Sequence, residues 1–91
     1  MLEISISDSA QEFIVNLESK FARQIVRKIK LLAEHPTPPQ SKVLEGYTPL
    51  RRLRSGDYRI IYVVQGAVLK IPLIDKRGDD KVYRRLKQLL G

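Results

Sequence analysis

The sequence predicts an α+β fold in which a helical hairpin packs on a small, mainly antiparallel sheet. Apolar residues recur every three to four positions in the first third of the chain, as in amphipathic helices. From residue 50 onward they follow the period of two that is typical of strands. The 91 residues suffice for one core, so we expect a single domain over 1–91 in the order β-α-α-β-β-β-α.

The first strand and helix are predicted near the N-terminus. Residues 2–6 alternate apolar and polar side chains, as expected of a half-buried strand. Ser9 and Glu12 have the spacing of a helix capping box, and Asp8 is the alternative cap. The apolar face of this helix comprises Ala10, Phe13, Ile14 and Leu17.

A second helix is expected after a break at Ser19. Its apolar face comprises Phe21, Ile25, Ile29 and Leu32, and its opposite face is basic, with Lys20, Arg23, Arg27 and Lys30. This basic face is either a solvated exterior or a contact with RNA. The segment 34–39 contains three prolines and ends the helix, because proline lacks an amide donor. His35, beside the first proline, is expected to have no catalytic role.

The second half of the chain predicts three antiparallel strands over 50–54, 58–64 and 67–74, joined by turns at Ser55-Gly56-Asp57 and Gln65-Gly66. Pro72 should lie where the sheet needs no amide donor. The segment 75–78 is expected to leave the sheet, and Asp79 or Asp80 to cap a last helix. The inward residues of that helix would be Val82, Leu86, Leu89 and Leu90.

The composition excludes several classes of protein. There is no cysteine and a single histidine, so disulfide frameworks, thiolate metal sites and Cys/His catalytic triads are absent and no metal site is expected. No apolar run is long enough to span a bilayer, and the N-terminal residues do not resemble a signal peptide. We expect a cytoplasmic protein without a membrane partner.

The basic charge points to a polyanionic partner. The chain has 17 Lys and Arg against 10 Asp and Glu, a net charge of +7. Residues 1–19 hold four acids and no base, residues 20–41 five bases and one acid, and residues 42–91 twelve bases and five acids. Such an excess favours nucleic acid, since binding releases counterions. Acidic proteins and anionic membranes remain alternatives on charge alone.

One segment resembles a known family. Residues 52–62, Arg-Leu-Arg-Ser-Gly-Asp-Tyr-Arg-Ile-Ile-Tyr, closely resemble the core signature of the RelE/ParE toxin superfamily. Other stretches of the chain match in order: 31–36 resembles the end of the family's second helix, 42–46 its linker to the sheet, and Lys76-Arg77 with Val82-Tyr83 its C-terminal active-site stretch.

The resemblance implies a RelE-like fold and a toxin of a type II toxin–antitoxin module. RelE-like members are endoribonucleases (mRNA interferases, a class of hydrolase) that cut mRNA on the ribosome and inhibit translation. ParE-like members poison DNA gyrase without cleaving RNA. A cognate antitoxin neutralises such toxins, and the toxin reaches operator DNA only through the antitoxin. We expect the ribosome-dependent nuclease, with contacts to mRNA and 16S rRNA and no cofactor; a gyrase poison and a degenerate, antitoxin-binding toxin are the alternatives.

RNA cleavage by the ribose 2′-OH needs a proton acceptor, cations for the phosphorane and stabilisation of the leaving 5′-oxygen, but no metal. By resemblance, the catalytic residues are Tyr83 as general base, Arg77 near the leaving oxygen, Arg59 at the phosphorane and Arg52 on the same sheet. The expected RNA-binding residues are Arg51, Arg54, Lys76 and Lys81. Strand alternation places Arg52 and Arg54 on one face and Arg51 on the other.

Structural roles are the alternative for each residue. Tyr83 would pack the last helix, Arg77 would be an exposed loop residue, and Arg59 would pair with an acid such as Asp57 or Glu45. Tyr58 and Tyr62 are expected to share a face and to pack in the core.

Two positions depart from the family pattern. Many relatives have Gly-His-Arg where this chain has Asp75-Lys76-Arg77, and a basic residue where it has Leu50.

Overall fold

The computed structural model describes residues 1–76, which form two helices and a five-stranded sheet. The strands are β1 (Glu3–Ile6), β2 (Lys42–Val43), β3 (Arg51–Ser55), β4 (Tyr58–Gln65) and β5 (Val68–Lys76), and the helices are α1 (Asp8–Val15) and α2 (Ser19–Glu34). The sheet order is β1-β5-β4-β3-β2, antiparallel except for the parallel pair β1–β5. The predicted α+β fold is thereby confirmed; the expected last helix over 79–90 lies outside the described residues.

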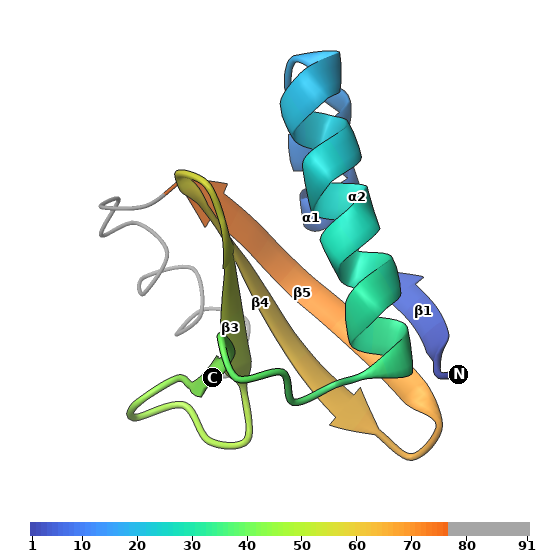
Figure 1. The fold of residues 1–91 in the computed structure, drawn as a ribbon, viewed down its shortest axis with the longest axis vertical. Coiled ribbons are helices and arrows are strands. Elements are labelled where there is room, and N and C mark those ends of the chain that lie inside the picture. Colours follow the sequence, from blue (N-terminus) through green and yellow to red (C-terminus); the bar gives the residue numbers. More distant parts are fainter. Residues whose placement is uncertain (77–91) are drawn as a thin grey trace.

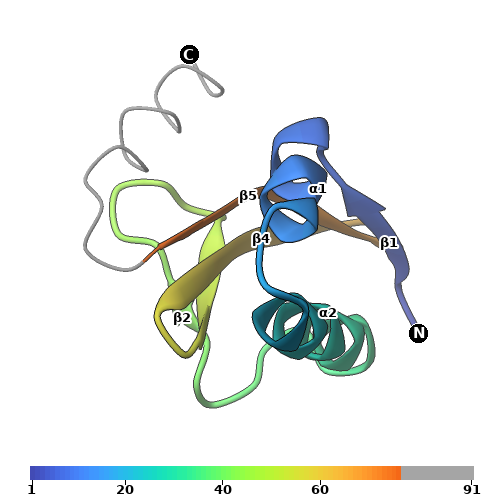
Figure 2. The same ribbon diagram turned by 90° about the horizontal axis from the view of Figure 1, so that it is seen from above.

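The two helices pack together beside the sheet (Figure 1), and α2 is seen nearly end-on from above (Figure 2). Their apolar faces and one face of the sheet form the main core. Its fully buried residues include Ala10, Ile25, Ile29, Leu32, Ile60, Tyr62, Leu69 and Ile71. Both apolar stripes predicted for the helices therefore point into the core, as amphipathic periodicity requires.

The start of α1 differs from the predicted capping box. Ser7, and neither Ser9 nor Asp8, is the N-cap: its hydroxyl accepts a bond from the Ala10 amide at 3.1 Å. The same hydroxyl donates to the carbonyl of Pro72 at 2.8 Å. The cap choice thus depends on β5, a contact between residues 65 positions apart that local spacing does not reveal.

The hairpin turns are two residues long and each begins with glycine. Ser55 pairs with Tyr58 and Gln65 with Val68, so Gly56-Asp57 and Gly66-Ala67 form the loops. Gly56 and Gly66 have φ of 60° and 59°. A positive φ at the first loop position is what a type II′ turn requires, and this turn matches the twist of the flanking strands.

Pro72 lies at an irregularity in β5, as the sequence predicted. Leu73 pairs with Ile61 but Lys70 pairs with Val63, so two residues of β5 oppose the single Tyr62 of β4. Such a bulge leaves one residue out of the ladder and accommodates proline, which has no amide proton. The bulge also keeps Ile71 and Ile74 on the helix-covered face although they are three residues apart.

Two expectations about segment boundaries were wrong. Residues 42–46 are not only a linker, because Lys42 and Val43 pair with Arg52 and Arg51 as the edge strand β2. Residues 75 and 76 do not leave the sheet, because Asp75 pairs with Arg59 and Lys76 with Tyr58 at the end of β5. Both pairings are long-range and were not evident from local composition.

Candidate nucleic-acid interface

The sheet face opposite the helices carries a cluster of basic side chains. Along β3, Leu53 and Ser55 are buried on the helix side, so Arg52 and Arg54 point to the other face, here called the open face. On β4, Arg59 lies between Tyr58 and Ile60, which both pack in the main core, and so joins the open face. The Cα partners Arg54 and Arg59 are directly opposite each other across the two strands.

The basic cluster of the open face consists of Arg52, Arg54 and Arg59. Residues two apart on a strand are about 7 Å apart, and neighbouring strands are about 5 Å apart. The three side chains therefore lie close together on the open face. Lys42, the partner of Arg52 on β2, extends the cluster toward the edge. Three of the residues expected to contact or cleave RNA are therefore brought together by the β3–β4 hairpin.

A small apolar cluster borders these arginines. Leu44, Leu50, Ile61 and Leu73 are buried there, with Tyr47 and Val63 packed against them. Leu50, where many relatives have a basic residue, is 5% exposed and belongs to this cluster. Its apolar side chain therefore has a structural role, and a cation at this position would lose most of its solvation.

Arg59 forms an ion pair with Asp75 of β5. The distance from its Nη2 to Asp75 Oδ2 is 3.8 Å, and the two side chains are 11% and 16% exposed. The alternative prediction, that Arg59 pairs with an acid, is thus confirmed. The acid is Asp75, however, and not Asp57 or Glu45. Strand register identifies it, because Asp75 is the Cα partner of Arg59.

Arg51 lies apart from the basic cluster. Its Nη2 donates to Ser41 Oγ at 2.9 Å and to the Ser41 carbonyl at 3.4 Å, and its Cα partner is Tyr62 on the helix-covered face. The predicted alternation between Arg51 and its neighbours is thus observed. The expected RNA contact of Arg51 remains a prediction.

The remaining site residues are at or beyond the end of the described chain. Lys76 is exposed and ends β5. Arg77, Lys81 and Tyr83 lie outside the described residues, so their predicted roles remain predictions.

The two tyrosines of β4 are structural, as expected. Tyr62 is fully buried and its hydroxyl donates to the Pro36 carbonyl at 2.6 Å. Tyr58 packs against Phe13 and Phe21, with ring centroids 5.8 and 5.7 Å apart. Both rings therefore pack against the core.

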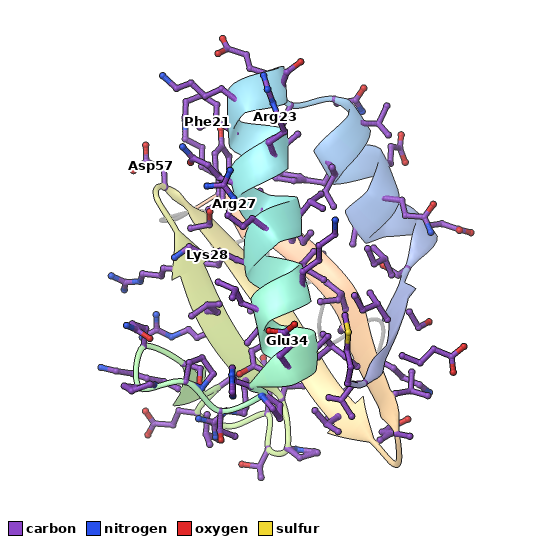
Figure 3. All side chains as sticks on the ribbon, turned by 45° about the vertical axis from the view of Figure 1, so that its right-hand side comes forward. Phe21, Arg23, Arg27, Lys28, Glu34 and Asp57 are labelled. Carbon is purple, nitrogen blue, oxygen red and sulfur yellow. The ribbon has the colours of Figure 1, made fainter. Side chains whose placement is uncertain are left out.

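A second basic surface runs along α2. Lys20, Arg23, Arg27 and Lys30 are exposed on the side opposite the buried residues of the helix. Figure 3 shows Arg23 and Arg27 about one turn apart on this helix. A shallow groove of about 360 Å³ is lined by Ala22, Arg23, Val26, Arg27 and Lys30. It has an apolar floor and cationic edges, and sequence periodicity predicted its basic character.

The part of the chain that the structure describes contains no group of three metal-ligating side chains. None of its helices is long and apolar enough to cross a membrane.

Comparison with known proteins places this geometry in a family. A solved variant of the E. coli RelE toxin in the free state superposes with a TM-score of 0.81 at 22% identity, over 99% of this chain and 98% of that one. RelE in the RelE–RelB complex from Pyrococcus horikoshii gives 0.74 at 28% identity, over 85% and 96%. YoeB from a Staphylococcus aureus dimer gives 0.65 at 20%, over 78% and 91%.

Among curated protein sequences, no significant match was found. The profile of the family described as "ParE toxin of type II toxin-antitoxin system, parDE" matches residues 4–81. This match spans both helices, the basic cluster and, apart from Glu3, all five strands. The chain therefore belongs to the RelE/ParE superfamily of type II toxins, with the fold of the RelE proteins.

Proposed function

We propose that this toxin is a ribosome-dependent mRNA endoribonuclease that inhibits translation. The observation that supports this activity is the convergence of Arg52, Arg54 and Arg59 on one face of a RelE-type sheet. Guanidinium groups are suited to phosphate because they are planar, permanently charged and donate two parallel hydrogen bonds. A single RNA strand laid across β3 and β4 would present successive phosphates to these three side chains.

In the proposed reaction the ribose 2′-oxygen attacks the adjacent phosphorus. The 2′-proton passes to the phenolate of Tyr83, the P–O5′ bond breaks, and the leaving 5′-oxygen takes a proton from solvent water, so that the products are a 2′,3′-cyclic phosphate and a 5′-hydroxyl. Arg59 stabilises the extra negative charge of the phosphorane, and Arg77 stabilises the leaving oxygen. Arg52, Arg54, Lys76 and Lys81 hold the flanking phosphates.

Tyr83 can act as a base only if cations lie beside it, because a tyrosine with a pKa of about 10 is largely protonated at neutral pH. Positive charge beside a phenol lowers its pKa by favouring the phenolate. The sequence places Lys81, Arg84 and Arg85 within two residues of Tyr83.

For the ribosome we propose that the basic surface of α2 contacts 16S rRNA. The groove bordered by Arg23, Arg27 and Lys30 is on the helix layer, away from the open face. A toxin with cations on both layers can bind a folded RNA with one and the substrate strand with the other. Counterion release supports both contacts.

A cognate antitoxin is the proposed protein partner. RelE is bound to RelB in the solved complex from P. horikoshii. Here three large apolar residues are exposed: Val15 is 80%, Leu31 54% and Val43 50% exposed. An acidic, amphipathic segment wrapped over the sheet and helices would cover both kinds of surface. We propose that the toxin reaches operator DNA only through this antitoxin.

The test is mRNA cleavage in a reconstituted translation system, mapped by primer extension. We expect cuts in the ribosomal A site with the wild type, and losses of about 100-fold or more with Arg59→Gln, Arg77→Ala and Tyr83→Phe. Lys28 lies outside the groove of Arg23, Arg27 and Lys30 and away from the open face, so Lys28→Gln removes one charge and should cleave normally. Intact mRNA on translating ribosomes would refute the nuclease.

The second candidate is a DNA gyrase poison, which the match to ParE toxins favours. A gyrase assay that traps cleaved DNA separates it from the first candidate. Gyrase-dependent DNA cleavage together with intact mRNA would establish the second activity.

A further inference from the structure

A charged row crosses three strands of the open face. Arg54 of β3 is the Cα partner of Arg59 of β4, and Arg59 is the Cα partner of Asp75 of β5. Asp75 is thus an acid placed at the end of a pair of arginines, inside the surface to which the proposed function assigns phosphate binding. Its Oδ2 lies 3.8 Å from Arg59 Nη2, and both side chains are mostly covered.

The row has a simple electrostatic basis. Like charges directly opposite on neighbouring strands destabilise a sheet, so Arg54 and Arg59 repel each other in the folded state. Covering Arg59 also removes part of its hydration. A carboxylate on the next strand offsets both effects, because it attracts the nearer guanidinium and draws it toward β5.

The contact between Arg59 Nη2 and Asp75 Oδ2 is electrostatic. A charge-assisted hydrogen bond between nitrogen and oxygen is about 2.7–2.9 Å long, so the 3.8 Å between these two atoms is an ion pair and not a direct bond. A guanidinium has five N–H donors, so a phosphate that approaches the open face can form close hydrogen bonds with Arg59 while the contact with Asp75 weakens. Carboxylate and phosphate bind the same fork of donors.

We propose that Asp75 is a positioning residue, whose carboxylate occupies Arg59 in the free toxin and orients it to receive the scissile phosphate. This inference rests on the proposed nuclease. Asp75 acts through Arg59 and does not exchange a proton with the substrate. Its negative charge repels incoming RNA, so the same residue weakens binding and supports the reaction step.

The two effects predict opposite changes in one variant. With Asp75→Asn, RNA binding should tighten roughly two- to fivefold, the range of partly exposed charge interactions. The cleavage rate at saturating substrate should fall roughly 10- to 100-fold, since Arg59 is no longer aligned with the phosphate. A side chain that merely stabilised the fold would not tighten binding while it slowed turnover.

Asp57→Asn is the matched control. Asp57 is exposed at the β3–β4 turn on the same hairpin and loses the same charge. It should change both parameters less than about twofold, the effect of an exposed charge. Asp75→Glu keeps the carboxylate and should recover part of the rate; it also serves if Asp75→Asn does not fold.

Binding is measured by fluorescence anisotropy with a single-stranded RNA oligonucleotide, and turnover in the reconstituted translation system. The positioning role would be overturned if Asp75→Asn turned over at the wild-type rate. It would also be overturned if Asp57→Asn slowed turnover by the same factor as Asp75→Asn. Slower turnover without tighter binding would overturn the proposed competition between carboxylate and phosphate.

A double-mutant cycle tests the ion pair without RNA. Denaturant unfolding is measured for wild type, Arg59→Gln, Asp75→Asn and the double variant. If the pair stabilises the fold, the double variant loses less stability than the sum of the single losses. Additive losses would refute the pair itself. If the wild type neither binds nor cleaves RNA, the nuclease and the role of Asp75 in it both fail, and only the structural pair is retained.

Discussion

The salt dependence of RNA binding is the most direct measure of the basic cluster. For single-stranded nucleic acid, the slope of log K against log salt is about −0.7 for each phosphate neutralised. The structure directs three arginines, Arg52, Arg54 and Arg59, to the open face. If each neutralises one phosphate, together they contribute about −2 to the slope.

The expected effect is large enough to measure. Between about 50 and 200 mM KCl, one contact of this kind corresponds to a loss of affinity of about 2.6-fold, and three contacts to about 20-fold. Replacing all three arginines with glutamine should therefore flatten the slope by about 2. The assay is fluorescence anisotropy with a labelled single-stranded RNA at several KCl concentrations, and circular dichroism confirms that the variants are folded.

Arg51→Gln is the comparison within the same strand. It removes the same charge, but Arg51 donates to Ser41 and its Cα partner is on the helix-covered face. If Arg51 keeps its bond to Ser41 when RNA binds, the slope of this variant matches the wild type. A slope flattened by about 0.7 would instead show that Arg51 contacts RNA, as the sequence resemblance suggested. An unchanged slope in the triple variant would refute the assignment of the open face as the RNA surface.

Three further predictions concern stability, measured by urea unfolding. Tyr62→Phe removes the donor to the Pro36 carbonyl and should cost about 1–3 kcal/mol, and a loss below about 0.5 kcal/mol would show that water replaces the hydroxyl. Gly56→Ala should cost about 1–3 kcal/mol through its positive φ alone, since no atom lies within 4 Å of the added Cβ; Asp57→Ala, at the other loop position, where φ is not positive, should cost less, and equal losses would contradict this reasoning. Ile29→Ala empties a buried site and should cost about 2–5 kcal/mol, whereas Val64→Ala, at a 37% exposed position, should cost far less.

Most of the architecture follows from local patterns in the sequence. Ile25 and Ile29 have helical spacing and are buried, because an amphipathic helix can only place such residues against a core. Strand alternation is sufficient to separate Arg51 from Arg52 and Arg54, because successive side chains of a strand point to opposite faces. Residues 52–62, with the other stretches that match in order along the chain, indicated the family that the profile match confirms.

Which side chains and strands contact one another is decided by the tertiary structure. Tertiary contacts select Ser7 as the cap of α1 through Pro72, add β2 to the edge of the sheet, and make Asp75 the acid beside Arg59. These choices depend on strand register and on contacts between residues far apart in the chain. The two-residue turn fixes the register of β4 and β5 next to Gln65, but the bulge opposite Tyr62 shifts it by one residue, and only then does Arg59 pair with Asp75. The pairing is resolved only when both faces of the sheet are packed together, and the acid partner of Arg59 follows from it.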